Sequence, residues 1–234
     1  MIEIKDLHFR WSSHTPLVLE IPALTIKAGE TVFVRGPSGS GKSTLLNLIG
    51  GVLEPIDGEL IVLGQNMSEI SPRQRDALRG DEMGFIFQQF NLLPYLTVLE
   101  NILLPLKFSK MKTEKLNERG ATPESEAVRL LSRLGLDIKK IGQRKVTELS
   151  VGQQQRVAAV RSLIGWPGLI IADEPTSSLD ADTRNRFIKL MIEECRQIKA
   201  TLLFVSHDGS LASEFERVVD LISLNKAYIP EEFS

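Results

Sequence analysis

Cysteine is almost absent from this sequence, in which Cys195 is the only one among 234 residues. A single thiol excludes an internal disulfide framework and a metal site built from cysteines. Ile188, Met191 and Ile192 precede Cys195 at helical spacing, which predicts a packed thiol rather than a reactive one. Because a chain without disulfides suits a reducing compartment, we expect a cytoplasmic protein.

Long apolar runs and a large net charge are missing as well. No stretch approaches the roughly 18 apolar residues that a membrane span requires, and the alternating start Met-Ile-Glu-Ile-Lys-Asp is unlike a secretory signal. The formal net charge of −2 gives no bulk electrostatic reason to bind nucleic acid, so we expect no nucleic-acid partner. With 42% hydrophobic and 25% charged residues, the composition is that of a soluble globular protein.

Short strand patterns and one helix fill the first third of the chain. In the first strand pattern Ile2 and Ile4 share one parity, whereas Leu7, Phe9 and Trp11 share the other. A helical pattern covers residues 44–53, and we expect the strands around it to form an antiparallel β layer. Apolar residues predict these strands at residues 2–11, 17–21, 24–26, 31–35 and 59–63.

The rest of the chain is mostly helical until residue 164 and then alternates strands with helices. The polar, Gly- and Pro-interrupted stretch 110–125 predicts an exposed loop or a frayed helix end. Apolar runs at 169–172 and 201–205 predict buried strands around a helix at 181–200. This order is typical of a parallel sheet covered on both faces. We expect an α/β fold, a single domain over residues 1–234 in which about 90–162 form a helical subdomain.

Residues 36–43 fit the phosphate-binding pattern G-x-x-x-x-G-K-S between a predicted strand and a predicted helix. Glycines let backbone N–H groups turn toward phosphate oxygens, and the following helix adds its positive end. Lys42 supplies a charge for the β- and γ-phosphates, and the Ser43 hydroxyl suits Mg²⁺. A glycine-rich strand–helix junction without function is the alternative. The motif predicts a nucleoside triphosphate site, and nothing finer, made by Gly36, Pro37, Ser38, Gly39, Ser40, Gly41, Lys42, Ser43 and Thr44.

Two carboxylates follow the buried strand at 169–172. At the carboxyl edge of a parallel sheet, Asp173 would face the phosphate loop and hold Mg²⁺ through water. Glu174 beside it would polarise the attacking water as a general base. Taken alone, the pair could be an ordinary acidic turn, but the phosphate loop favours the functional interpretation.

Ser150 precedes another helical pattern and is predicted to cap it. The free N–H groups and the dipole of that helix form a second anion site, far in sequence from the first. Without further context, an ordinary capped helix is the better interpretation of the pattern.

Residues 149–153, Leu-Ser-Val-Gly-Gln, resemble the L-S-G-G-Q signature of the ABC ATPase family. Other motifs of that family stand in the expected order, and the resemblance covers residues 2 to about 224. Without them, His207 would be read as structural and Trp11 as a core aromatic. The matching residues are Trp11 for the aromatic on adenine, Gln88 for the Gln loop, Asp180 in Ser-Ser-Leu-Asp for the loop that links two sites, and His207 for the switch histidine.

The resemblance implies a phosphate-loop ATPase core with a mainly parallel sheet, an N-terminal antiparallel layer and a helical insertion. It implies ATP and Mg²⁺ as cofactors, with Ser43, Gln88 and Asp173 at the metal. It also implies a head-to-tail homodimer, in which the signature of one subunit covers the ATP held by the phosphate loop of the other. The signature residues, together with the linking loop, would be Ser150, Gly152, Gln153 and Asp180.

The resemblance further implies an integral membrane permease as partner, driven from the cytoplasmic face of the inner or plasma membrane. Residues 89–94 and 153–156 are similar to the lipoprotein-release and macrolide-export subgroup. An ABC ATPase of a non-transporting membrane complex, in cell division or signalling, would carry the same motifs. Soluble ABC proteins of translation or DNA repair usually have two cassettes or a long coiled-coil insertion, and a phosphate-loop kinase lacks the signature. We expect Phe90, Leu93 and Tyr95 to line a groove for a short permease helix.

Three features depart from the family pattern. Val151 replaces the first glycine of the signature and stiffens the cap. Ser150 and Gly152, which make the family's γ-phosphate contacts, are retained. Trp11 stands where Tyr is usual, and the residues after Leu224 lack the usual closing Gly turn and predict no appended regulatory module.

Overall fold

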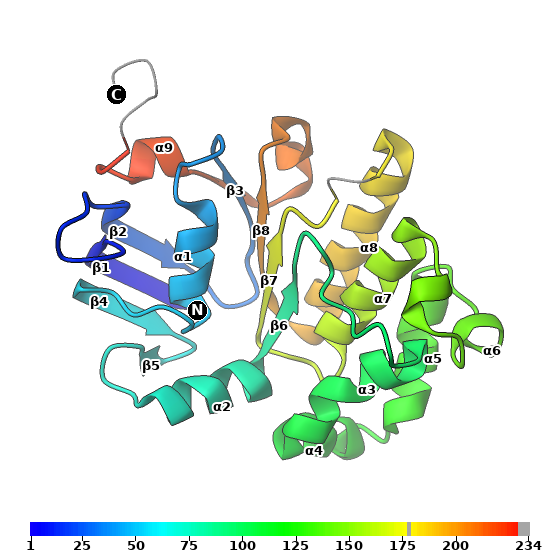
Figure 1. Ribbon diagram of the computed structural model, residues 1–234. Helices are drawn as coiled ribbons and strands as arrows, with labels where there is room; N and C mark the ends of the chain where they lie inside the picture. Colours follow the sequence, from blue (N-terminus) through cyan, green and yellow to red (C-terminus); the bar gives the residue numbers. More distant parts are fainter. Residues whose placement is uncertain (177–178, 229–234) are drawn as a thin grey trace.

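The computed structural model describes residues 1–176 and 179–228, which form two β-sheets and a group of helices (Figure 1). The antiparallel sheet has the order β2 (Leu19–Ile26), β1 (Ile2–Phe9), β4 (Asp57–Val62) and β5 (Gln65–Asn66). The parallel sheet has the order β6 (Met83–Ile86), β7 (Leu169–Asp173), β8 (Thr201–Ser206), β3 (Thr31–Arg35) and β9 (Arg217–Asp220).

The change of parity predicted in the first strand is confirmed as an irregularity of β1. Its register with β4 shifts between Lys5 and His8, and Asp6 between them has a left-handed backbone, with φ of 45°. The predicted strand is too long, however, because β1 ends at Phe9 and Trp11 lies beyond it. The two short strands predicted next are a single one, β2, whose edge position tolerates Pro22.

The three central parallel strands, β7, β8 and β3, are buried on both faces. Val32 and Val34 of β3 belong to one apolar core, and Phe33 between them belongs to another. The first core lies between the two sheets and includes Leu45 and Leu48 of α1 (Lys42–Ile49). α1 therefore stands between the antiparallel and the parallel sheet, as Figure 1 shows.

The second core joins the parallel sheet to the helices on its other side. In the described part of the chain, no helix is both long and apolar enough to cross a membrane. Two short 3-10 helices cover Val146–Glu148 and Gly209–Glu214. The remaining α-helices are α2 (Pro72–Glu82), α3 (Val98–Phe108), α4 (Lys110–Glu118), α5 (Pro123–Arg133), α6 (Ile138–Ile141), α7 (Val151–Leu163), α8 (Ala181–Ile198) and α9 (Leu221–Leu224).

The stretch 110–125, predicted as an exposed loop or a frayed helix end, is mostly regular helix, and only residues 119–122 between α4 and α5 form a loop. α4 fills most of that stretch, with the Ser109 hydroxyl accepting a hydrogen bond from the Lys112 N–H. Lys112 and Leu116 are both buried, and the Lys112 ammonium donates to the Met83 carbonyl at 2.9 Å. A lysine on the inner face hides the amphipathic pattern, which is why the sequence appears polar throughout.

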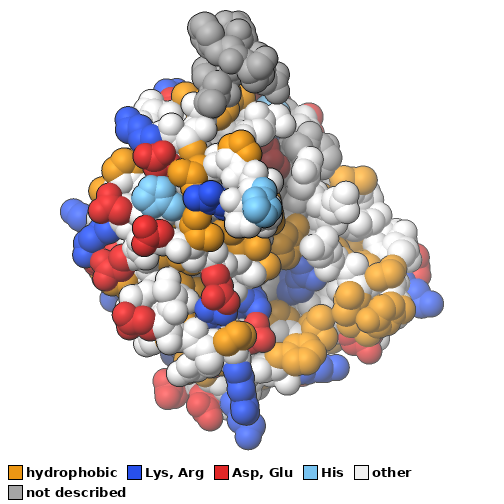
Figure 2. All heavy atoms as spheres, turned by 60° about the vertical axis from the view of Figure 1, so that its left-hand side comes forward, with side chains coloured by type: hydrophobic (Ala, Val, Ile, Leu, Met, Phe, Trp, Pro, Cys, Tyr) orange, Lys and Arg blue, Asp and Glu red, His pale blue; other side chains and the backbone are white. Residues whose placement is uncertain are grey.

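Cys195 is fully buried in α8, as predicted, and burial raises the pKa of its thiol. The face of the molecule that carries the antiparallel sheet shows acidic and basic side chains interspersed (Figure 2). That face therefore presents no extended patch of one charge.

Candidate active site

The phosphate loop connects β3 to α1 in a conformation that depends on its glycines. Gly39 and Gly41 have φ of 78° and 95°, in the left-handed region that other residues rarely adopt. A Cβ atom on Gly41 would also lie only 2.7 Å from Leu19 Cδ2. The loop is thus packed against the beginning of β2, and Gly41 permits that approach.

Lys42 and Ser40 fold back on the loop's own carbonyl groups. The Lys42 ammonium donates to the carbonyls of Gly36, at 2.8 Å, and Pro37, at 2.7 Å. The Ser40 hydroxyl donates to the Pro37 carbonyl, and Ser40 is only 1% exposed. Pro37 and Ser40 therefore shape the loop, whereas Lys42 lines the cavity described below.

Asp173 at the end of β7 lies beside the phosphate loop, as predicted. Its Oδ2 accepts a hydrogen bond of 2.9 Å from the Ser43 hydroxyl. Burial raises the pKa of the Asp173 carboxyl, and the Ser43 hydrogen bond partly offsets this effect. A hydroxyl and a carboxylate from distant segments thus meet at the carboxyl edge of the parallel sheet.

Glu174 turns away from the strand toward β8. Its backbone is left-handed, with φ of 47°, and its N–H donates to the Val205 carbonyl. Glu174 Oε1 accepts from the His207 N–H at 2.9 Å and lies 2.8 Å from His207 Nδ1. Oε2 accepts from the Ser206 hydroxyl at 3.2 Å. The carboxylate is therefore oriented by donors from the next strand.

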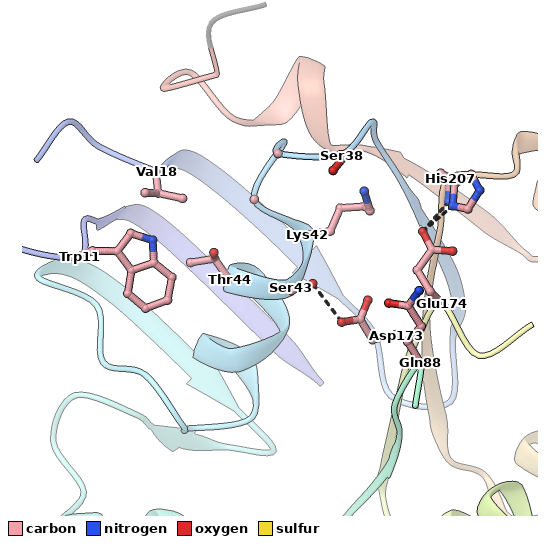
Figure 3. A pocket seen from close by; sticks show the side chains of 12 residues that line it. Trp11, Val18, Ser38, Lys42, Ser43, Thr44, Gln88, Asp173, Glu174 and His207 are labelled. Atoms are coloured by element: carbon pink, nitrogen blue, oxygen red, sulfur yellow. Dashed lines mark hydrogen bonds and ion pairs between the residues drawn. The ribbon is translucent and has the colours of Figure 1, made fainter. Parts of the chain in front are cut away.

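These residues share one cavity of about 510 Å³, large enough for a nucleotide. In Figure 3, Trp11 and Val18 stand on one side, Lys42 in the middle, and Glu174 with His207 on the other side. Trp11 lies perpendicular to Phe9, with ring centroids 5.1 Å apart, and is 61% exposed, so much of its ring is accessible to a ligand. The cavity is lined by Trp11, Val18, Ser38, Gly39, Gly41, Lys42, Ser43, Thr44, Gln88, Asp173, Glu174 and His207.

The signature residues lie elsewhere. Ser150 caps α7, with its hydroxyl accepting from the Gln153 N–H and the Gln153 side chain accepting from the Ser150 N–H. Gly152 lines a separate cavity that also includes Leu179 of the segment before α8. Asp180 caps α8 by accepting from the Thr183 N–H. Residues 177 and 178 of the same predicted motif lie outside the described residues.

Sequence reasoning missed two residues around the site. Val18 lines the cavity on the same side as Trp11, but an apolar residue before a strand carries no recognisable signal. Arg161 of α7 donates to the carbonyls of Phe90 and Asn91, both left-handed, and so fixes the segment after Gln88. The sequence does not reveal this contact, because Arg161 lies far along the chain from Phe90 and Asn91.

The prediction that Phe90 lines an outer groove is wrong, because Phe90 is 8% exposed and belongs to the helical core. Tyr95 is 69% exposed, but neither Tyr95 nor Leu93 lines the groove described next. A groove of about 300 Å³ does lie nearby, lined in part by Phe87, Leu104 and Phe108.

A strand–loop–helix phosphate site beside an acidic strand end defines the class of phosphate-loop nucleotide-binding domains. The profile of the family described as "ABC transporter" matches residues 19–177. The chain belongs to this family and is an ATP-binding cassette with ATPase chemistry. The resemblance drawn from the motifs is thereby confirmed.

Two kinds of related protein support the same family membership. The chain is 41% identical over 198 residues to the "Lipoprotein-releasing system ATP-binding protein LolD" of Xanthomonas axonopodis pv. citri, covering 85% of this chain and 78% of that protein. It is 38% identical over 226 residues to the "Macrolide export ATP-binding/permease protein MacB" of Hyphomonas neptunium, covering 94% of this chain but 33% of that protein.

Two solved structures share the fold. The dimeric structure of MJ0796, titled a bacterial ABC transporter cassette, has a TM-score of 0.80 and 36% identity, covering 94% of each chain. The dimeric post-hydrolysis state of MJ0796 with ADP and Pi has a TM-score of 0.81 and 34% identity, covering 99% of this chain and 97% of that one. Both confirm the predicted α/β class.

Proposed function

We propose that this chain hydrolyses Mg²⁺-ATP as one of two identical subunits that drive a separate membrane permease. One observation carries the proposal: a single cavity collects a lysine, a serine, two carboxylates, a glutamine and a histidine from distant segments. Each has the chemistry that ATP hydrolysis requires. The helical part at about 90–162 would act as a subdomain of a single unit spanning 1–234.

Mg²⁺ suits the residues at the phosphate loop. Ser43 and Asp173, already 2.9 Å apart, offer a hydroxyl and a carboxylate, and Gln88 adds an amide oxygen in the same cavity. Mg²⁺ prefers such oxygen ligands and is usually held by few of them, together with substrate phosphates. When bound, Mg²⁺ would offset charge on the phosphate oxygens.

Hydrolysis requires water to attack the γ-phosphorus opposite the leaving oxygen. Glu174 is the proposed base, which accepts the proton of that water. His207, hydrogen-bonded to Glu174 in this structure, would contact the γ-phosphate, and Lys42 would leave the loop carbonyls for the β- and γ-phosphates. The exposed ring of Trp11 would receive adenine.

The signature residues explain why two copies would be needed. Ser150, Gly152 and Gln153 do not line the cavity of the phosphate loop in this chain, nor does Asp180. Two-fold symmetry lets the signature of one copy complete the site of the other. The related MJ0796 cassette is described as dimeric in both of its structures.

The groove near Phe87 is the proposed contact for the permease. Phe108 beside it is 79% exposed, and an apolar groove of this kind accepts the apolar face of a short helix. Because Phe87 is adjacent to Gln88, such a contact would link the partner to the metal site. The chain would accordingly sit on the cytoplasmic face of the membrane.

The purified chain tests the nucleotide site directly. We expect slow ATP hydrolysis that stops when Mg²⁺ is chelated, and weaker ATP binding by Lys42→Ala because the charge on the phosphates is lost. Lys5→Ala, which removes an exposed lysine of β1, is the matched control and should bind ATP normally. Unchanged ATP affinity in Lys42→Ala would show that the loop is not the phosphate site.

A further inference from the structure

A buried asparagine near the end of the described chain reaches beneath the nucleotide cavity. Asn225, just after α9, is 2% exposed. Its Oδ1 accepts from the Glu20 N–H at 2.8 Å and from the Ala227 N–H at 3.2 Å. Its Nδ2 donates to the Val18 carbonyl at 2.9 Å and to the Ser40 carbonyl at 3.3 Å. All four hydrogen-bonding positions of the amide are therefore used.

The two donated hydrogen bonds connect the adenine side of the cavity to the phosphate loop. Val18 stands beside Trp11 on the side proposed for adenine, whereas Ser40 belongs to the phosphate loop (Figure 3). These segments also touch directly, since Gly41 packs against Leu19. Asn225 bridges the same two segments from outside the cavity.

The hydrogen bond to Ser40 also orients the loop. A trans peptide unit is planar, so its N–H points opposite to its carbonyl. Because the Ser40 carbonyl is held by Asn225, the N–H of Gly41 in the same peptide unit is directed to the opposite side. Gly41 lines the cavity, where such an N–H can meet a phosphate oxygen.

The segment that carries Asn225 is anchored at a second point. Asp220 pairs with Arg35, the residue directly before the loop, at 2.8 Å. Leu221 is fully buried, and its Cβ lies 3.5 Å from where a Cβ on Gly36 would be. The Lys226 N–H donates to the Glu20 carbonyl at 2.8 Å. Asn225 is thus fixed relative to both segments that it bridges.

We propose that Asn225 is a positioning residue that sets the spacing between the adenine side of the cavity and its phosphate loop. This proposal rests on the nucleotide site proposed above. A ligand that spans both sides, such as ATP, depends on that spacing. Inorganic tripolyphosphate, which reaches only the loop, depends on it far less.

Asn225→Asp is the sharpest test, because it keeps the acceptor and replaces the donor by an oxygen facing two carbonyl groups. Asn225→Ala removes both functions without adding charge. For each variant we expect Mg²⁺-ATP affinity to fall at least about fivefold relative to tripolyphosphate affinity, the value of about one hydrogen bond. The KM for ATP should rise accordingly, with kcat at saturating ATP within about twofold, since Glu174 and His207 are untouched.

Asn101→Asp is the matched control. Asn101 is also fully buried and makes hydrogen bonds to backbone groups of residues 93–97, away from the cavity. It should lose a comparable amount of thermal stability without changing the ratio of ATP to tripolyphosphate affinity. If the Asn225 variants shift that ratio no more than Asn101→Asp does, the proposal is wrong.

Hydrogen exchange on the wild-type chain tests the same proposal without any substitution. ATP should slow exchange of the Glu20 and Lys226 amides more than tripolyphosphate does, because only ATP engages both sides. Equal protection by the two ligands would overturn the role of Asn225 while leaving the nucleotide site intact. If neither ligand binds, both proposals fall.

Discussion

At the scale of single residues, Glu174 is held in an unusual backbone conformation. A non-glycine residue in the left-handed region costs about 1–3 kcal/mol and persists only where its surroundings impose it. Here the Val205 carbonyl holds its N–H, and Ser206 and His207 hold its carboxylate. Such a strained, well-held carboxylate beside a phosphate loop is consistent with a catalytic role.

Glu174→Gln should keep ATP binding and lower turnover by about 10²–10⁴, the usual size of a general-base effect. The amide retains the shape of the side chain but cannot take a proton from water. Turnover and ATP affinity are measured on the same preparation, with Glu193→Gln as an exposed control on α8. A normal rate in Glu174→Gln would remove the catalytic assignment.

Trp11→Ala should weaken ATP binding by about 1–3 kcal/mol, as loss of base–aromatic stacking does elsewhere. Phe9 is 5% exposed and points into the core, so Phe9→Ala should instead reduce stability. Titration with ATP and thermal melting separate the two effects. If ATP binding is instead lost in Phe9→Ala alone, the assignment of adenine stacking to Trp11 is wrong.

At the scale of secondary-structure elements, α4 is attached to β6 through a buried lysine. Burial, together with the charge of the nearby Lys115, lowers the pKa of Lys112 from 10.5 to about 8. Between these two values the unfolded chain binds a proton that the folded chain does not. Stability contributed by this residue therefore rises with pH through that window.

We expect the unfolding free energy of the wild type, relative to that of Lys112→Met, to increase as pH rises from about 8 to 10. The increase is at most about 1.4 kcal/mol per pH unit. Urea denaturation at several pH values measures the difference. Met111→Leu, on the same helix, should follow the wild type. Parallel pH profiles for wild type and Lys112→Met would mean that the ammonium is not desolvated.

The sequence predicts an element's type best where all residues of that element are buried. β3 was predicted with its observed bounds, and β7 and β8 within one residue, because strands covered on both faces are apolar throughout. α2, β6 and β9 escaped prediction: α2 buries only Arg75, and the two strands, each of four residues, are the edges of their sheet. The motif residues of the cavity are predictable because phosphate and metal binding require particular residue types at fixed spacings, which the sequence displays. Val18, Arg161 and Asn225 are not, because they act through contacts between distant segments.

At the scale of the whole molecule, exposed apolar side chains gather at the groove beside Gln88. Phe108→Ser should leave basal ATPase activity within a few-fold and abolish co-purification with the membrane partner, because the side chain is exposed and lines the groove. Ile56→Ser, another exposed apolar residue, is the control and should retain the partner. Retained assembly in Phe108→Ser would place the contact elsewhere.

The account's central claim is that ATP joins two copies, each of which completes the site of the other. The most direct measurement is the mass of Glu174→Gln in solution, with and without Mg²⁺-ATP, because this variant should bind ATP without consuming it. We expect a monomer without nucleotide, a dimer with Mg²⁺-ATP, and no dimer when Lys42→Ala is added. A Glu174→Gln protein that stays monomeric while saturated with Mg²⁺-ATP would contradict the claim.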